Sequence, residues 1–206
     1  MTVAPEGRWI VGGAVVVALL ASVWLGAAAW PLWIAVLLVL QFFREPKRDV
    51  NVAADEIVSP ADGKVVFVGR ARSPADGAET VKIGVFMNVF NVHSNRSPAG
   101  GAVSESRRFA GAFFNAALDK ASEKNERHMI VIDGVHGKIV CVQVAGLLAR
   151  RVLCHAKVGD TLRGGERYGF IRFGSRADLY LPPHLRPAVA LGDSVVAGIT
   201  RVAAAP

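Results

Sequence analysis

The sequence predicts a mainly β domain, of the β-sandwich or barrel-sandwich class, preceded by an N-terminal hydrophobic helical hairpin. Two observations carry this prediction. Residues 9–43 contain no charged residue, which is typical of membrane helices. From residue 55 onward, short β-type runs alternate with Gly, Pro and Asp, as in all-β sandwiches and barrels. We therefore divide the 206 residues into a hydrophobic part, 1–43, and a β-rich part, 44–206.

The hydrophobic part is too long for one straight helix across a membrane. At about 1.5 Å per residue, residues 9–43 would exceed the roughly 30 Å hydrocarbon core, and Pro31 disfavours a continuous helix. Residues 9–30 are long enough to span, whereas residues 31–43 would cover only about 20 Å. We expect a re-entrant or interfacial hairpin.

The residues after the hydrophobic part predict its orientation. Arg44, Lys47 and Arg48 follow at once, and the positive-inside rule keeps a chain after such a cluster on the cytoplasmic face of the cell membrane. A cleaved signal peptide is the competing interpretation, but the segment is too long for one.

Cys141 and Cys154 lie in apolar runs without a CxxC pattern, so we expect buried, reduced thiols.

The charge of the chain favours an anionic membrane as a partner. The net charge is +7, and Glu6 and Arg8 cancel, so the whole excess belongs to the domain that begins near Arg44. No nucleic-acid recognition motif accompanies it, which argues against nucleic acid. A metal site is not expected, because four histidines show no paired ligand spacing and are interpreted as structural: His128, His136, His155 and His184.

The β-rich part contains seven runs that we interpret as strands. They are residues 64–69, 80–87, 128–134, 138–146, 151–156, 168–174 and 178–182. One internal similarity is present, because "GDTLRGG" (159–165) and "GDSVVAG" (192–198) share a Gly-Asp-hydroxyl-aliphatic pattern. These turns, with "SPADGKV" (59–65), are similar to turns of biotinyl and lipoyl carrier domains, which implies a barrel-sandwich. The carriers' lysine dipeptide is absent.

One segment of the β-rich part lacks β periodicity. Residues 112–127 begin with hydrophobic residues and continue with Glu, Lys and Asn, so we expect a loop or a short helix. Long excursions of this kind are often functional lids. Phe113 and Phe114 either meet lipid or substrate, or belong to the core.

A Gly-Ser pair interrupts the stretch "ERYGFIRFGSRADLYLP". A serine hydroxyl is a weak nucleophile unless a base takes its proton, and Gly174 leaves its carbonyl unshielded by any side chain. Attack of Ser175 Oγ on this carbonyl would turn the peptide into an ester, and elimination with hydrolysis would leave a pyruvoyl group. On the dipeptide alone, an ordinary turn is the alternative interpretation.

Five further stretches bear on this choice: "SPADGKV", "GVFMNVFNVHSNRSP", "NAALDKASEKNER", "VAGLLARRVLC" and "GERYGFIRFGSRADLYLP". Together, and in this order, they closely resemble the short form of the phosphatidylserine decarboxylase proenzymes, a pyruvoyl-dependent decarboxylase family. The resemblance covers residues 44–197, and the hydrophobic N-terminus also suits the family.

The resemblance implies a zymogen that processes itself. Autocatalytic cleavage between Gly174 and Ser175 would yield a β chain, 1–174, and an α chain, 175–206. The two chains would form a heterodimer, and assembly into a higher oligomer is left open. Ser175 would become the pyruvoyl group. This lyase forms a Schiff base with the amine of phosphatidylserine, loses carbon dioxide and gives phosphatidylethanolamine in phospholipid biosynthesis, without a metal or pyridoxal phosphate.

The resemblance also implies an Asp-His-Ser arrangement for processing. The matching positions are Asp62, His93 and Ser175. His93 would take the Ser175 proton, Asp62 would orient the imidazole, and His93 or a water it holds would later protonate the product carbanion. "SPADG" occurs twice, and we choose Asp62 over Asp76 because a strand-like run follows Asp62 directly.

Three residues are candidates for binding the substrate: Arg96, Asn95 and Asn115. The longer bacterial branch of the family has a second histidine at the position of Arg96 and a threonine at that of Arg176. His93 therefore serves both steps in one interpretation, and Arg96 binds the phosphate or carboxylate of the headgroup in another. A plain surface arginine is the remaining interpretation.

Two other functions stay open. The first is a membrane-tethered β-sandwich binding module that never cleaves. The second is a Schiff-base enzyme that uses Lys120, although this lysine lies in a polar segment with nothing to lower its pKa.

Overall fold

The computed structural model describes residues 2–112, 114, 116, 124–146, 151–172 and 174–205. The chain forms two compact units, residues 1–48 and 49–206, and each is described by itself.

The first unit is a helical hairpin, as the sequence predicts. Its elements are η1 (Pro5–Gly7), α1 (Arg8–Leu25), η2 (Gly26–Ala29) and α2 (Trp30–Phe42), with β1 (Thr2–Val3) pairing antiparallel to β2 (Arg44–Glu45). The chain reverses at Gly26, whose φ of 55° suits glycine. Pro31 lies in the first turn of α2, where its missing N–H costs little. Across the hairpin, Trp33 Nε1 donates a hydrogen bond to Ser22 Oγ at 3.1 Å.

The outer surface of the hairpin is apolar. The helical run Pro5–Phe42 is long and apolar enough to cross a membrane, by length and composition, although it turns within that run. Large side chains such as Trp9 and Trp24 are almost fully exposed to solvent. Such a surface is more stable in lipid than in water, which is consistent with association of this unit with a membrane. The side of the membrane on which the second unit lies stays a prediction.

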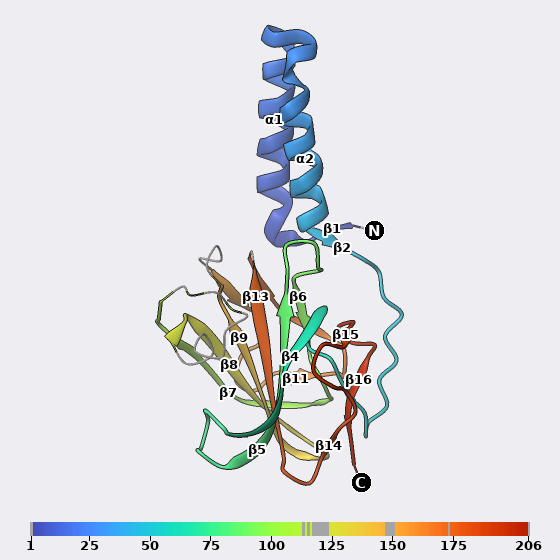
Figure 1. Cartoon of the computed structure of the whole chain (residues 1–206), viewed down its shortest axis with the longest axis vertical. Helices are drawn as coiled ribbons and strands as arrows, with labels where there is room; N and C mark the ends of the chain where they lie inside the picture. The colour runs from blue at the N-terminus through green and yellow to red at the C-terminus, as the bar shows by residue number, and fades with distance from the viewer. Residues whose placement is uncertain are drawn as a thin grey trace. The chain divides into compact units, whose positions relative to one another are not determined.

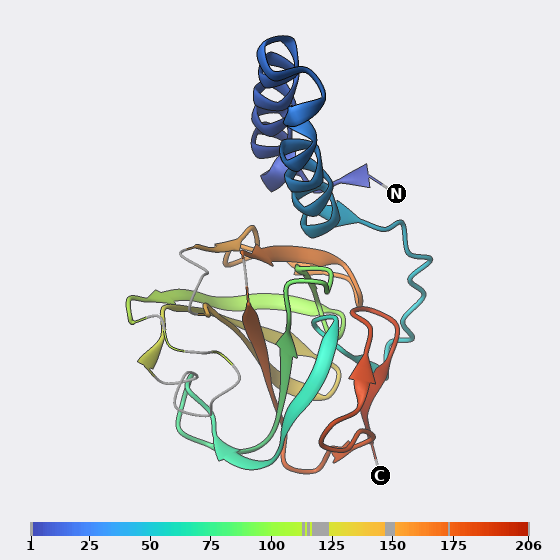
Figure 2. The same cartoon turned by 45° about the horizontal axis from the view of Figure 1, so that its top comes forward.

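The second unit is built on one curled, antiparallel eight-stranded sheet (Figures 1 and 2). Its order is β11 (Thr161–Leu162), β7 (Gly101–Phe109), β8 (Arg127–Gly134), β9 (Gly137–Val144), β13 (Ser175–Leu181), β5 (Glu79–Met87), β4 (Gly63–Arg72) and β15 (Ser194–Val195). Two three-stranded sheets complete the fold: β10 (Val152–Cys154), β12 (Arg167–Ile171) and β6 (Ser94–Arg96); and β14 (Arg186–Pro187), β16 (Arg201–Ala204) and β3 (Ile57–Val58).

The main core lies between these sheets. Inward residues of the large sheet, such as Ile83 and Leu179, share one cluster with Tyr168 of β12 and Val202 of β16. The predicted β-sandwich is therefore confirmed. All seven predicted strands are present. The prediction missed β7, because its sequence "GAVSESRRF" is too polar for a strand signal, and it missed the short strands β3, β6, β11, β14, β15 and β16. Pairing with β8 forms β7 despite its composition.

The two Gly-Asp turns occupy equivalent places at opposite edges of the large sheet. Asp160 Oδ2 accepts the Lys157 N–H, and Asp193 Oδ2 accepts the Ala190 N–H, each at 2.8 Å. The following strands, β11 and β15, pair with the starts of β7 and β4. Gly159 and Gly192 have φ values of 94° and 93°. The similarity seen in the sequence is thus a structural repeat.

The repeat extends to the turns that precede β4 and β7. "SPADG" (59–63) precedes β4 and "SPAGG" (97–101) precedes β7. In each turn the serine hydroxyl donates to the alanine carbonyl two residues on, at 2.7 Å. Asp62 of the first turn is matched by Gly100 in the second. The turn therefore forms without a carboxylate.

The outer face of the sheet carries a buried ion cluster. Asp178 bonds the Arg176 guanidinium at 2.5 Å and the Lys82 ammonium at 3.2 Å, and the Arg176 and Asp178 side chains are fully buried. A side chain at Gly84 would overlap the guanidinium of Arg176. Glycine at this point of β5 makes room for a large cation inside a sheet. The Lys82 ammonium also lies 5.2 Å from the Tyr180 ring centre.

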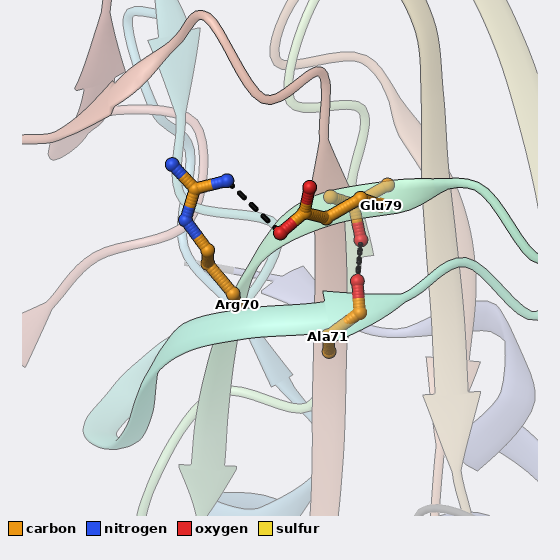
Figure 3. A network of polar contacts seen from close by, with 4 residues as sticks. Arg70, Ala71 and Glu79 are labelled. Carbon is orange, nitrogen blue, oxygen red and sulfur yellow. Dashed lines mark hydrogen bonds and ion pairs between the residues drawn. The ribbon is translucent and has the colours of Figure 1, made fainter.

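An exposed ion pair lies on the same hairpin of β4 and β5 (Figure 3). Arg70 Nη1 bonds Glu79 Oε1 at 3.0 Å, with side chains 67% and 64% exposed. Beside it, Thr80 Oγ1 donates to the Ala71 carbonyl at 2.7 Å. The Arg70–Glu79 pair is exposed to water, whereas the Arg176–Asp178 pair is fully buried.

We expect Asp178→Asn to lower the free energy of unfolding by roughly 3–5 kcal/mol, because it removes the negative charge that two buried cations share. Glu79→Gln is the matched control, and its exposed pair should contribute below about 1 kcal/mol. Urea unfolding of the detergent-solubilised variants measures both. Equal effects would contradict the assignment of Asp178 as the buried counter-ion.

Candidate active site

Three segments meet at Met87, the last residue of β5. Ser175, the first residue of β13, pairs with Met87 on one side. Gly63, the first residue of β4, lies on the other side, so close that an added Cβ would overlap the carbonyl oxygen of Phe86. The third segment, β6, contacts Met87 through Asn95, whose Nδ2 lies 3.9 Å from Met87 Sδ. The starts of β4 and β13 are thus about 10 Å apart, with one strand between them.

Ser175 faces the core and not the solvent. Its side chain is fully buried, and its Oγ lies 3.8 Å from Met87 Sδ. The residue before it, Gly174, has a φ of 56°, a conformation that favours glycine. β13 pairs along its whole length with β5 and along most of it with β9. The Gly174–Ser175 peptide therefore lies at the rigid end of a central strand.

The carbonyl of Gly174 is held against a second glycine. A Cβ built on Gly146 would overlap the carbonyl oxygen of Gly174 and lie 3.4 Å from Ala116 Cβ. The register that pairs Arg176 with Val144 brings the two glycines together. Close backbone approach, and not a positive φ, explains the glycine here. Sequence reasoning missed Gly146 as a site residue, although a glycine directly after an apolar strand is a signal for such an approach.

His93 is fully buried just before β6. Its Nδ1 lies 3.0 Å from the Asn91 carbonyl oxygen. Because a carbonyl only accepts, Nδ1 carries the proton in the neutral ring and the lone pair is on Nε2. The main chain holds the segment as well, since Ile171 N donates to the His93 carbonyl at 3.2 Å. This tautomer makes Nε2 the basic atom, and sequence reasoning did not anticipate the role of Asn91.

Asp62 and Asp76 lie at opposite ends of β5. Asp62 directly precedes β4 beside Met87, and its Oδ1 accepts the Ala197 N–H at 2.8 Å. Asp76 is in the hairpin between β4 and β5, where its Oδ1 accepts the Ala78 N–H at 3.1 Å. That hydrogen bond lowers the pKa of Asp76, with a smaller effect from Ser73. The nine residues of β5 separate the two turns by roughly 25 Å.

Asn95 and Arg96 have different surroundings. Asn95 is fully buried, and its Oδ1 accepts a hydrogen bond from Gln143 Nε2 at 2.8 Å. Gln143 also donates to the Leu153 carbonyl at 3.3 Å. Arg96 is partly exposed, and its Nη1 donates to the Gly165 carbonyl at 3.0 Å. Asn95 thus contacts the same Met87 sulfur as Ser175, whereas Arg96 has access to solvent.

Several predicted residues are not assigned a place. Asn115, Lys120 and Phe113 lie outside the described residues. Phe114 is about half exposed, and its backbone is bonded on both sides to the Asn125 amide, at 2.9 Å and 2.8 Å. The same amide donates to the Ala145 carbonyl at 2.7 Å, next to Gly146.

Both cysteines are free thiols. Burial raises the pKa of Cys154 to about 11 and raises the pKa of Cys141 further. They are therefore protonated and unreactive near neutral pH. Among the described residues, no three His, Cys, Asp or Glu side chains are grouped to hold a metal ion.

Known proteins resemble this chain over most of its length. The family described as phosphatidylserine decarboxylase matches residues 36–203. A phosphatidylserine decarboxylase proenzyme of Ralstonia nicotianae is 51% identical over 98% of this chain and 94% of its own length. The proenzyme of Polynucleobacter asymbioticus is 54% identical over 87% of this chain and 84% of its own, and that of Paraburkholderia xenovorans 49% identical over 98% and 96%. The chain belongs to the phosphatidylserine decarboxylase family.

Proposed function

We propose that this chain is a membrane-associated proenzyme that cleaves itself between Gly174 and Ser175 and then decarboxylates phosphatidylserine to phosphatidylethanolamine. The observation that carries the proposal is the Gly174–Ser175 peptide itself, because the Ser175 side chain is fully buried at the start of β13 and the Gly174 carbonyl lies against Gly146. The segments of His93 and Asp62 gather at the same end of β5. Self-attack requires this combination of a fixed carbonyl, a hydroxyl and a nearby base.

Cleavage begins with the attack of Ser175 Oγ on the Gly174 carbonyl carbon. His93 Nε2 takes the hydroxyl proton and returns it to the Ser175 nitrogen as the C–N bond breaks, which leaves an ester. Removal of the Ser175 Cα proton expels the Gly174 carboxylate and ends the β chain, 1–174. Water then replaces the nitrogen, which leaves as ammonia, and the α chain begins with a ketone at residue 175.

The product stays assembled because of where the cut falls. β13 is the first element of the α chain, 175–206, and it pairs with β5 and β9 of the β chain. β14, β15 and β16 also belong to the α chain, and β15 and β16 pair with β4 and β3. Breaking one peptide bond leaves these ladders intact. The two chains form a heterodimer.

The residues present suit a pyruvoyl group at position 175. The group would form from Ser175, whose side chain is fully buried with its Oγ 3.8 Å from Met87 Sδ. When formed, its ketone condenses with the substrate amine and withdraws electrons as carbon dioxide leaves. Neither a metal nor pyridoxal phosphate is then required. His93 Nε2, or a water it holds, carries the proton that the product carbon needs.

Two features support Asp62 as the acidic member of the processing set. It lies at the Met87 end of β5, whereas Asp76 forms a hairpin turn at the other end. The equivalent turn before β7 has Gly100 in its place, so the turn itself does not need the carboxylate. In the proposed role, Asp62 stabilises the cation that forms when His93 takes the Ser175 proton.

The phosphate and carboxylate of the lipid headgroup are negatively charged, so we expect a cationic side chain near the site. Arg96 suits it, because a guanidinium has five donors in a planar fork that matches phosphate and carboxylate. Asn95 and Asn115 are kept as further candidates. The basic domain favours an anionic surface, and the cluster after the hairpin predicts that the catalytic unit faces the cytoplasm at the cell membrane.

We expect the purified chain to run as two fragments on a denaturing gel and Ser175→Ala to run as one, because alanine has no hydroxyl to attack the carbonyl. Intact mass should show that the smaller fragment begins with a pyruvoyl group at residue 175. A wild-type chain that stays whole would favour the non-cleaving binding module.

Borohydride trapping with substrate should place the label on residue 175, and label on Lys120 would favour the lysine-dependent enzyme.

We expect Asp62→Asn and Asp62→Gly to slow self-cleavage at least about a hundredfold, since the imidazole cation loses its counter-charge. Asp62→Gly copies the natural sequence of the equivalent turn, so it should still fold. The control is Asp76→Asn, which should cleave at the wild-type rate. The measurement is a gel time course after synthesis, and the opposite result would exchange the two aspartates.

We expect Gly146→Ala to block formation of the ester, because its methyl group displaces the Gly174 carbonyl. Hydroxylamine, which cuts esters, should then release no fragment from the variant. Gly100→Ala is the control, since the nearest atom to its added Cβ is 3.7 Å away, and it should be processed normally. The double variant Gly146→Ala/Ala116→Gly tests the alternative of a clash with Ala116. If it restores cleavage, the constraint is side-chain packing and not the carbonyl.

A further inference from the structure

The turn between β5 and β6 exposes two consecutive apolar side chains. Val89 is 40% exposed and Phe90 is 64% exposed. The residues that flank the turn are buried, with Met87 on one side and Val92 on the other. Most exposed valines and leucines elsewhere on the catalytic unit need no explanation, because they occur singly on protein surfaces. An adjacent valine and phenylalanine next to the candidate catalytic histidine differ from these.

The turn is held by its own asparagines. Asn91 Oδ1 accepts the Asn88 N–H at 2.9 Å, Asn88 Oδ1 accepts the Phe90 N–H at 2.8 Å, and the Asn88 carbonyl accepts the Asn91 N–H at 3.1 Å. These bonds fix the backbone in a compact Asx turn. The apolar side chains are thereby presented outward by a rigid support, at little cost in conformational entropy.

The same turn orients the imidazole of His93. The carbonyl oxygen of Asn91 binds His93 Nδ1 at 3.0 Å. A force on the turn therefore acts directly on the ring whose Nε2 we assign as the base.

A second turn, beside Asp62, also combines exposed apolar side chains with a hydrogen bond to a candidate site residue. Val196 and Ile199 are 39% and 54% exposed, and Ala197 between them donates its N–H to Asp62. The structural repeat supplies an internal comparison. In the other copy, Arg163 stands at the position of Val196 and Glu166 at the position of Ile199. The turn is therefore compatible with charged residues, and its apolar residues are not required for folding.

We propose that the Asn88–Asn91 turn inserts Val89 and Phe90 into the headgroup region of the phosphatidylserine bilayer and so presents the His93 site to the lipid surface. The identity of this partner rests on the proposed function, since the substrate is an amphiphile whose acyl chains stay in the bilayer. His93 and Ser175 are fully buried, so a headgroup must leave the lipid surface and enter the domain to reach them. Apolar and aromatic side chains on a basic domain suit the interface of an anionic membrane.

A site-specific label tests this contact in the full chain, because the hairpin binds the membrane by itself and bulk binding is uninformative. Phe90→Cys is made in a Cys154→Ser background, because Cys154 is only partly buried, and is labelled with a polarity-sensitive fluorophore; Cys141 is buried and stays unlabelled. With phosphatidylserine vesicles the emission should shift to the blue. The control is Val135→Cys, at a residue that is 71% exposed, and its label should not shift.

Kinetics give a second, independent readout. For Val89→Ser/Phe90→Ser, the ratio of kcat/KM on phosphatidylserine vesicles to kcat/KM on a monomeric short-chain phosphatidylserine should fall at least about tenfold, since two apolar side chains no longer enter the interface. Val135→Ser should keep the wild-type ratio. An unchanged ratio in the double variant, or an unshifted Phe90→Cys label, would overturn the proposal.

The outcomes separate this proposal from the proposed function. A wild-type chain that is inactive on both substrates contradicts the decarboxylase assignment, whereas an active chain with an unchanged ratio contradicts only the membrane contact. If the double variant changes the oligomeric state on size exclusion while the vesicle ratio stays constant, the turn is an interface between copies of this chain, and the membrane contact is wrong.

Discussion

The pairing of β13 with both of its neighbours is the constraint on which the site depends. Because β5 and β9 hold this strand on its two sides, the position of Ser175 beside Met87 and that of Gly174 beside Gly146 are set by backbone hydrogen bonds. A hydroxyl and a carbonyl of adjacent residues rarely meet productively in a flexible loop. A central strand that begins at the serine supplies the required rigidity, and in the proposed reaction it would keep the two fragments together after cleavage.

The catalytic unit uses one structural repeat in two ways. The turn before β7 and the turn before β4 form the same hydrogen bonds, yet only the latter has an aspartate, Asp62, where the former has Gly100. A duplicated framework of this kind separates folding from chemistry, because one copy demonstrates what the backbone alone requires. Residues that depart from the repeat are then candidates for function, and Val196 and Ile199 depart from it in the same manner as Asp62.

The face of the sheet opposite Ser175 explains an otherwise odd residue. Arg176 directly follows the candidate nucleophile and is fully buried with Asp178 and Lys82. Side chains alternate along a strand, so this cluster lies on the outer face while Ser175 lies on the core face. Arg176 therefore contacts Asp178 on the outer face of β13, on the side of the strand opposite the reacting serine.

The sequence by itself determined the elements whose signals are local. An uncharged run broken by Pro31 predicted the hairpin, β-type runs between turn residues predicted the sandwich, and two similar Gly-Asp heptads predicted the repeat, because each signal lies within one short window. Only the tertiary structure decided what depends on long-range pairing. It formed β7 from a polar sequence, brought Gly146 to the Gly174 carbonyl, made Asn91 the partner of His93 and separated Asp62 from Asp76 by the length of β5. Strand register and backbone approach join residues far apart in the chain, and a local pattern does not specify which residues they join.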